Sequence, residues 1–300
     1  MKTYRIYQVD SFTKERFHGN PAGVVPNADG LTEEQMQRIA RELNNSETAF
    51  IFQSNSSEYD IEVRFFTPTV EVPICGHATI AAHYVYAKEN NFASRRVIQK
   101  TKAGILPVDV EKHGNEYSII MTQGTPVVSE PFDRDIRNQI ADALGIFERD
   151  ICGEYPIAIS STGHSKVMIP IYSNELLHKL NPKADKLTEI SEQIGCNGYY
   201  VFTLNQQDDI LVHGRMFAPA IGISEDPVTG NANGPLGAYL VHFNILQDNS
   251  SNSFDFDIIQ GEAIKRDGTM HVHVEKEQNE PKAVQITGNA VVAFSTEISM

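Results

Sequence analysis

The feature that most constrains the fold of this chain is a phrase that occurs twice. Residues 64–85 read RFFTPTVEVPICGHATIAAHYV, and residues 215–241 read RMFAPAIGISEDPVTGNANGPLGAYLV. The matched positions are Arg64 with Arg215, Phe66 with Phe217, Pro68 with Pro219, Gly76 with Gly230, His77 with Asn231, and Ala78 with Ala232. In each copy, a run of small and apolar residues that is typical of a buried helix follows the glycine. The repetition predicts two similar halves rather than one continuous core.

The flanks of the two copies repeat in the same order. Residues 31–52 and 187–202 each read as an amphipathic helix that runs into a strand, and residues 99–110 resemble 260–274. Thr32 and Gln35 have the spacing of a helix capping box. We therefore expect two halves, each with many strands around a helix of small residues. The polar run 247–255 is expected to form a surface loop.

The joint between the halves is expected near residues 122–132, which are rich in Pro, Gly, Ser and Thr. We place the N-terminal half at 1–124 and the C-terminal half at 125–284. Residues 285–300 are expected to return to the first half as a strand. A chain of 300 residues is long enough for two domains of this size.

Composition excludes several classes of partner. The formal net charge is −14, so the chain as a whole repels nucleic acid and anionic membranes. The three cysteines, Cys75, Cys152 and Cys196, form no C-x-x-C pair. Their odd number indicates a reducing compartment, and we expect a cytoplasmic protein. No stretch has the length and apolarity of a signal peptide or a membrane span.

The two glycine motifs, Gly76-His77 and Gly230-Asn231, stand at the starts of the predicted buried helices. The first backbone N–H groups of a helix have no partner within it, and with the helix dipole they attract anions. Glycine allows a ligand to approach the backbone closely. The pair of motifs therefore predicts a site for a small molecule that carries a carboxylate.

Other interpretations of the same residues are weaker. A lone Gly-His before a helix is most often a turn and a cap. His77 and His83 are six positions apart and do not share a helical face, and His271 with His273 lacks an evident third metal ligand. Cys75 would need a neighbouring base to act as a nucleophile, and its counterpart in the second copy is Thr229.

An acidic side chain stands on one side of the repeat only. Glu47 lies where the first helix becomes a strand, and its counterpart is Asn197. Asp226 precedes the second glycine motif, where an Asp before Pro often only shapes a turn. A single convincing base beside two anion-binding helix ends favours an isomerase over a two-base racemase. An amino-acid epimerase or racemase and a non-catalytic carboxylate-binding protein stay open as alternatives.

Four motifs in this order resemble the PhzF-like family of phenazine biosynthesis: GNPAGVV at 19–25, NNSETAF at 44–50, ICGHAT at 74–79 and EDPVTGNANG at 225–234. The resemblance runs over nearly the full length. It implies an α+β fold of the diaminopimelate epimerase type, with two pseudo-symmetric, β-barrel-like halves, each around a central helix, and the active site in the cleft between them. It also implies an isomerase that uses no cofactor or metal, acts on 2,3-dihydro-3-hydroxyanthranilate or a similar molecule, and associates as a homodimer.

The resemblance assigns roles to particular positions. Glu47 moves the proton between carbon atoms, and His77 and Asp226 assist it. The substrate contacts are expected at Gly76, Gly230, Asn231, Asn20 and Ser46. The chain departs from the family pattern at Asn231, where serine is usual, and at Lys265 and Asp267, where glycine and proline are usual. These departures bear on the identity of the substrate and not on the fold.

Overall fold

The computed structural model describes residues 1–205, 209–246 and 251–300, which divide into two compact units. Unit 1 comprises Met1–Thr122 and Thr287–Met300, and unit 2 comprises Gln123–Ile286. The sequence analysis expected boundaries at 124/125 and 284/285. Part of the loop expected at 247–255 lies outside the described residues, and its last residues, from Ser253 onward, already belong to a strand.

Unit 1 contains two helices and a closed ring of strands. Its elements are β1 (Thr3–Ser11), β2 (Asn20–Val25), α1 (Glu33–Leu43), β3 (Thr48–Gln53), β4 (Ile61–Phe66), β5 (Glu71–Val72), α2 (Gly76–Asn90), β6 (Arg95–Thr101), β7 (Gly104–His113), β8 (Glu116–Thr122) and the C-terminal part of β17 (Glu280–Ser299). Strands pair in the order β1–β2–β3–β4–β6–β7–β8–β17, and β17 returns to β1. This closed eight-stranded ring confirms the barrel-like character expected of the first half.

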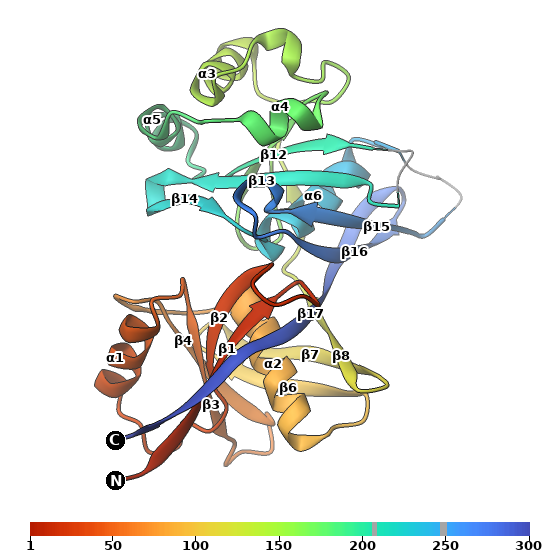
Figure 1. Cartoon of the computed structure of the whole chain (residues 1–300). Coiled ribbons are helices and arrows are strands. Elements are labelled where there is room, and N and C mark those ends of the chain that lie inside the picture. The colour runs from red at the N-terminus through yellow and green to blue at the C-terminus, as the bar shows by residue number, and fades with distance from the viewer. Residues whose placement is uncertain (206–208, 247–250) are drawn as a thin grey trace. The chain divides into compact units, whose positions relative to one another are not determined.

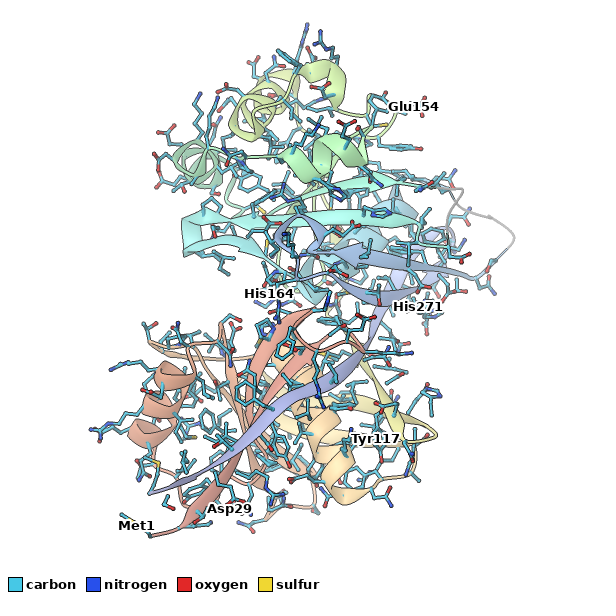
Figure 2. All side chains as sticks on the ribbon, viewed as in Figure 1. Met1, Asp29, Tyr117, Glu154, His164 and His271 are labelled. Atoms are coloured by element: carbon cyan, nitrogen blue, oxygen red, sulfur yellow. The ribbon has the colours of Figure 1, made fainter. Side chains whose placement is uncertain are left out.

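The helix α2 lies among the strands of this ring and packs on β1, β2, β3 and β8 (Figure 1). Its small side chains, including Ala78, Ala81 and Ala82, are fully buried, as expected of a helix that is surrounded on all sides. The ring of Tyr84 in this helix and the ring of Tyr117 on β8 are nearly perpendicular, with centroids 6.5 Å apart. Figure 2 labels Tyr117.

The helix α1 covers the outside of the same unit with one apolar face. Met36, Ile39 and Ala40 are its buried residues. The capping box predicted from the sequence is confirmed: the Thr32 hydroxyl accepts from the backbone N–H of Gln35, and the Gln35 side chain accepts from the backbone N–H of Thr32. Both bonds satisfy backbone donors that the first turn of a helix leaves without partners.

Unit 2 consists of a sheet with helices on both sides. Its elements are β9 (Val127–Val128), α3 (Arg134–Leu144), η1 (Glu148–Asp150), β10 (Ala158–Ser161), β11 (Lys166–Pro170), α4 (Asn174–Lys179), α5 (Ala184–Ile194), β12 (Tyr199–Leu204), β13 (Val212–Ala218), η2 (Pro219–Ile221), β14 (Ile223–Asp226), α6 (Gly230–His242), β15 (Ser253–Gln260), η3 (Glu262–Ile264) and β16 (Gly268–Glu277). Helices α3, α4 and α5 lie on one side of the sheet and α6 on the other (Figure 1). The helix α6 packs on β9, β10, β11, β15 and β16.

The strand pairings follow one another in the same way in the two units. In unit 1, β2 and β3 are parallel, β3 and β4 antiparallel, β4 and β6 parallel, and β6 and β7 antiparallel. In unit 2, the same succession joins β11, β12, β13, β15 and β16. Among the described residues, no helix is long and apolar enough to cross a membrane.

Candidate functional site

Glu47 occupies the short link between α1 and β3. Asn44 ends α1 in the left-handed conformation, with φ 53°, and its N–H donates to Ala40 O. The backbone then enters β3, which pairs with β2 so that Gly23 lies opposite Thr48. The Glu47 carbonyl accepts from Gly23 N at 3.2 Å, which fixes the residue at the strand entrance. Its side chain is 20% exposed, so the carboxylate is open to a ligand.

His77 stands in the first turn of α2 and points its imidazole at this link. Its Nε2 lies 3.4 Å from Glu47 Oε2 and 3.2 Å from Ser46 Oγ. The backbone of the same residue is anchored, because Ser11 Oγ donates to the His77 carbonyl at 2.8 Å. The histidine is buried, and its ring is held on the side of Nε2 by two consecutive residues of the link. The structure therefore brings Ser46, Glu47 and His77 together.

Cys75 completes the cluster on the other side of the imidazole. Its Sγ lies 3.4 Å from His77 Nδ1. The residue is buried and extended, and it forms the N-cap of α2, where its carbonyl accepts from Thr79 Oγ1 at 2.7 Å. The sequence analysis did not assign Cys75 a nucleophilic role, because its counterpart in the second copy of the repeat is Thr229. It did not predict the contact with His77. The ligand atoms of Glu47, Cys75 and His77 all lie within 4.8 Å of one another, so the three could also hold a metal ion.

Two further predicted residues of unit 1 belong to the same neighbourhood by their backbone positions. Gly76 is the first residue of α2 and lies between Cys75 and His77. Asn20 begins β2 and pairs with Ser11, whose hydroxyl binds the His77 carbonyl. Asn20 is almost completely buried, at 1% exposure. The first turn of α2 carries no acidic side chain, so its N–H groups keep the positive potential of a helix start.

The predicted residues of unit 2 cluster around the start of α6. Asp226 ends β14, and its carboxylate accepts a short hydrogen bond from the hydroxyl of Thr229. The amide of Gln260 donates to Asp226 O at 2.8 Å and to Thr229 Oγ1 at 3.0 Å, and its carbonyl accepts from Asn233 Nδ2 at 2.9 Å. Asp226 is thus part of a buried polar network that holds the entrance to α6.

Gly230 and Asn231 are the first two residues of α6. The Gly230 carbonyl accepts from Gln123 Nε2 at 3.0 Å, and Gln123 Oε1 in turn accepts from Thr162 Oγ1 at 2.5 Å. Asn231 is half-buried. The helix start is therefore held rigidly by side chains from two other segments of unit 2.

Lys166 is a charged group near this network that sequence reasoning missed. Its stem lies over Gly198, where an added Cβ would come within 2.2 Å of Lys166 Cδ. Burial lowers the pKa of the Lys166 amine, and the charges of Cys196 and Asp226 oppose that shift. A glycine before β12 does not show which side chain lies over it, so the sequence held no specific signal for Lys166.

Comparison with known proteins identifies the family. Residues 9–296 match the PhzC-PhzF family, described as phenazine biosynthesis-like protein. The chain belongs to this family. The family membership predicted from the four motifs is therefore confirmed.

Relatives within the family show the class of activity. The chain is 59% identical over 300 residues to an uncharacterized isomerase of Clostridium acetobutylicum, and the match covers 99% of each sequence. Because this relative is named an isomerase and the family is one of isomerases, the chain is an isomerase.

Solved structures show the fold. The crystal structure of the Bacillus anthracis phenazine biosynthesis protein of the PhzF family matches with a TM-score of 0.89 and 32% identity, over 100% of both chains. A hydroxyproline epimerase from Agrobacterium vitis matches with a TM-score of 0.64 over 99% of this chain and 93% of that one. At 11% identity, the second likeness concerns the fold alone. The fold is therefore that of the PhzF proteins and their epimerase and racemase relatives.

Proposed function

We propose that this isomerase moves a proton between two carbon atoms of a small carboxylated cyclic amino acid or enol, similar to 2,3-dihydro-3-hydroxyanthranilate. The observation that carries the proposal is the pairing of Glu47 Oε2 with His77 Nε2 at 3.4 Å, at the start of a buried helix. A carboxylate that is partly exposed and held on one oxygen keeps its other oxygen for the substrate. Glu47 is the acid/base in this mechanism.

The proton path follows from the contacts of His77. With a ring proton on Nε2, His77 donates to Ser46 Oγ and holds that nitrogen 3.4 Å from Glu47 Oε2, and its Nδ1 accepts from the thiol of Cys75. Glu47 takes a proton from one carbon, becomes a neutral carboxylic acid, and returns the proton to another carbon. The substrate keeps its atoms and its charge, so the net change is an isomerisation that requires no co-reactant.

Substrate binding is assigned to the helix starts. The backbone N–H groups after Gly76 are suited to a carboxylate, because they lack partners within the helix and carry the positive end of its dipole. The assignment of Asp226, Gly230 and Asn231 to the substrate rests on the sequence resemblance and on a second buried helix that begins at glycine. Asn20 and Ser46 are assigned as substrate contacts on the same resemblance.

We also infer that the two units are pseudo-symmetric products of an internal duplication. The repeated sequence, the shared succession of strand pairings and the two helices that begin at Gly76 and Gly230 support this inference. A cytoplasmic homodimer that serves a biosynthetic pathway is proposed from the family resemblance and from the three buried free cysteines. A monomeric mass by light scattering would remove the dimer from this proposal.

One observation supports a second candidate function. The thiol of Cys75 touches His77 Nδ1 at 3.4 Å, and a thiol beside an imidazole can act as a base at Cα of an amino acid. An epimerase or racemase of this kind would introduce solvent deuterium at Cα with loss of optical activity. That activity would require Cys75 and would survive Glu47→Gln.

The experiment that separates these functions is proton NMR in deuterated water. Wild type, Glu47→Gln and Cys75→Ala are each incubated with 2,3-dihydro-3-hydroxyanthranilate and with a panel of small cyclic amino acids. If the protein is the proposed isomerase, the substrate loses a ring C–H signal when it is incubated with wild type or Cys75→Ala, and it keeps that signal with Glu47→Gln. The opposite dependence on the two variants indicates the epimerase. Ligand binding without exchange in any protein indicates a binding protein that has no catalytic role.

A further inference from the structure

Three side chains that can bind a metal ion converge in unit 2 on residues that the proposed function does not use. His178 comes from α4, His213 from β13 and Glu262 from η3. His213 Nδ1 lies 2.7 Å from Glu262 Oε2, and His178 Nε2 lies 3.2 Å from the same oxygen. All three ligand atoms lie within 4.8 Å of one another. One nitrogen of each imidazole therefore points at a common centre with the carboxylate.

The position of His178 against His213 is fixed by a neighbouring arginine. Arg215 follows His213 by two positions in β13, so the two side chains leave the same face of the strand. The guanidinium Nη1 donates to Leu177 O at 2.8 Å and to Leu180 O at 2.9 Å. These carbonyls flank His178 at the end of α4. The last turn of the helix is thus tied to the strand that carries His213.

The register between β13 and β15 positions Glu262 near His213. Strands β13 and β15 are parallel, and Gly214 lies opposite Gln260, the last residue of β15. The chain then turns at Gly261, which has φ +92°. An added Cβ there would come within 2.4 Å of Arg266 O and 2.7 Å of Pro227 O, so only glycine fits this turn. The residue after the turn is Glu262, which is thereby placed beside His213.

The donor set matches a divalent transition metal. Zinc binds imidazole nitrogen and carboxylate oxygen at about 2.0–2.2 Å, which places tetrahedral ligand atoms about 3.3 Å apart. The separation of 3.2 Å between His178 Nε2 and Glu262 Oε2 is close to this value, and the 2.7 Å between His213 Nδ1 and the same oxygen would have to widen by about 0.6 Å to admit the ion. The His178 side chain is 39% exposed, which leaves a path for the ion.

We propose that His178, His213 and Glu262 form a binding site for a divalent transition metal of the zinc class, separate from the cluster around Glu47. The bound ion joins α4, β13 and η3 and completes its coordination with water. Its role is structural, because it cross-links three segments that come from separate parts of unit 2. The competing arrangement is a set of hydrogen bonds from protonated histidines to the carboxylate, with no metal.

The test uses Co²⁺ and Zn²⁺ with the full-length chain. Cobalt is titrated into a Cys75→Ala protein, which removes the thiol of the other candidate cluster, and visible absorption reports coordination. His213→Ala and His178→Gln are made in the same background; the second is the more exposed position and guards against misfolding. The matched control is His271→Ala on β16, a position that Figure 2 labels. The His271 Nδ1 lies 2.8 Å from Asp257 Oδ1 on β15.

The proposal expects one cobalt ion per chain with absorption bands free of thiolate charge transfer. Loss of either ligand should weaken binding more than about 100-fold, beyond the 10–100-fold that loss of an outer-shell partner costs. The control His271→Ala should bind as tightly as its parent. Zinc should raise the midpoint of thermal unfolding only where both histidines are present. No binding, or binding that His271→Ala weakens and the two ligand variants do not, would overturn the site.

Discussion

Arg215 donates two hydrogen bonds to the carboxylate of Glu225, from Nε to Oε1 at 2.9 Å and from Nη2 to Oε2 at 2.6 Å. Arg64 binds Glu71 in the same two-pronged way, at 2.8 and 2.6 Å. Arg64 and Arg215 are matched positions of the sequence repeat. Arg215 is the more buried of the two arginines, with its side chain 7% exposed against 22% for Arg64, whereas the side chains of Glu225 and Glu71 are 11% and 6% exposed. Arg215 also donates to the carbonyl of Leu177 in α4.

Replacing Arg215 by alanine should therefore destabilise the chain strongly. The change leaves the Glu225 carboxylate buried and unpaired, which costs roughly 3–5 kcal/mol of unfolding free energy. Arg64→Ala is the matched comparison, since its own side chain is 22% exposed and Lys102 still binds Glu71. Urea unfolding should show a clearly smaller loss for Arg64→Ala. Equal losses would mean that burial does not set the strength of these pairs.

The buried His83 predicts a pH dependence of stability. Burial lowers its pKa from 6.5 to about 4, and its Nε2 pairs with Gln99 Oε1 at 3.0 Å. In the unfolded chain His83 binds a proton below about pH 6.5, whereas in the folded chain it binds one only below about pH 4. The free energy of unfolding therefore falls as the pH falls from 6.5 to about 4. A shift of this size corresponds to about 3 kcal/mol.

The variant His83→Gln tests this relationship, because the amide keeps a donor for Gln99 and does not titrate. Urea unfolding between pH 4 and pH 8 should show a shallower acid loss of unfolding free energy in the variant than in wild type. If the plots of unfolding free energy against pH were parallel for the two proteins, protonation of His83 would not destabilise the folded state.

Lys166 provides a charge test of the network around Asp226. Because the carboxylate opposes the downward shift that burial imposes, Asp226→Asn should lower the pKa of the Lys166 amine further. The titration can be followed by NMR of lysine labelled at Cε. The control is Asp255→Asn, whose carboxylate pairs with His273 at 2.6 Å. If the pKa of Lys166 were unchanged in Asp226→Asn but shifted in Asp255→Asn, the electrostatic interaction between Lys166 and Asp226 would be refuted.

The parts of the structure that follow from local pattern were accessible in the sequence. The capping box of Thr32 and Gln35 is a signal within four consecutive residues, and the start of α2 at Gly76 follows from a turn residue before a run of small side chains. The family was identifiable because its motifs are short and ordered. The barrel of unit 1 required the resemblance, since no single strand reveals ring closure.

The parts that depend on register were not accessible. His178, His213 and Glu262 come from three segments, and their meeting requires Gly214 to face Gln260 across two parallel strands. The contact between Cys75 and His77 depends on a ring orientation that spacing alone does not give. The sequence analysis did not identify Lys166, because its side chain occupies space that is open only since Gly198 on the neighbouring segment has no side chain.

The measurement that most directly tests the central claim is the rate of deuterium exchange into 2,3-dihydro-3-hydroxyanthranilate, or the best substrate of the panel, by wild type and Glu47→Gln. General acid/base catalysis contributes typically 10²–10⁴-fold, so exchange by the variant should fall by at least about 10²-fold. Binding of the substrate should stay near the wild-type level, because Gln preserves the shape of the side chain. Exchange at the wild-type rate in Glu47→Gln would contradict the account.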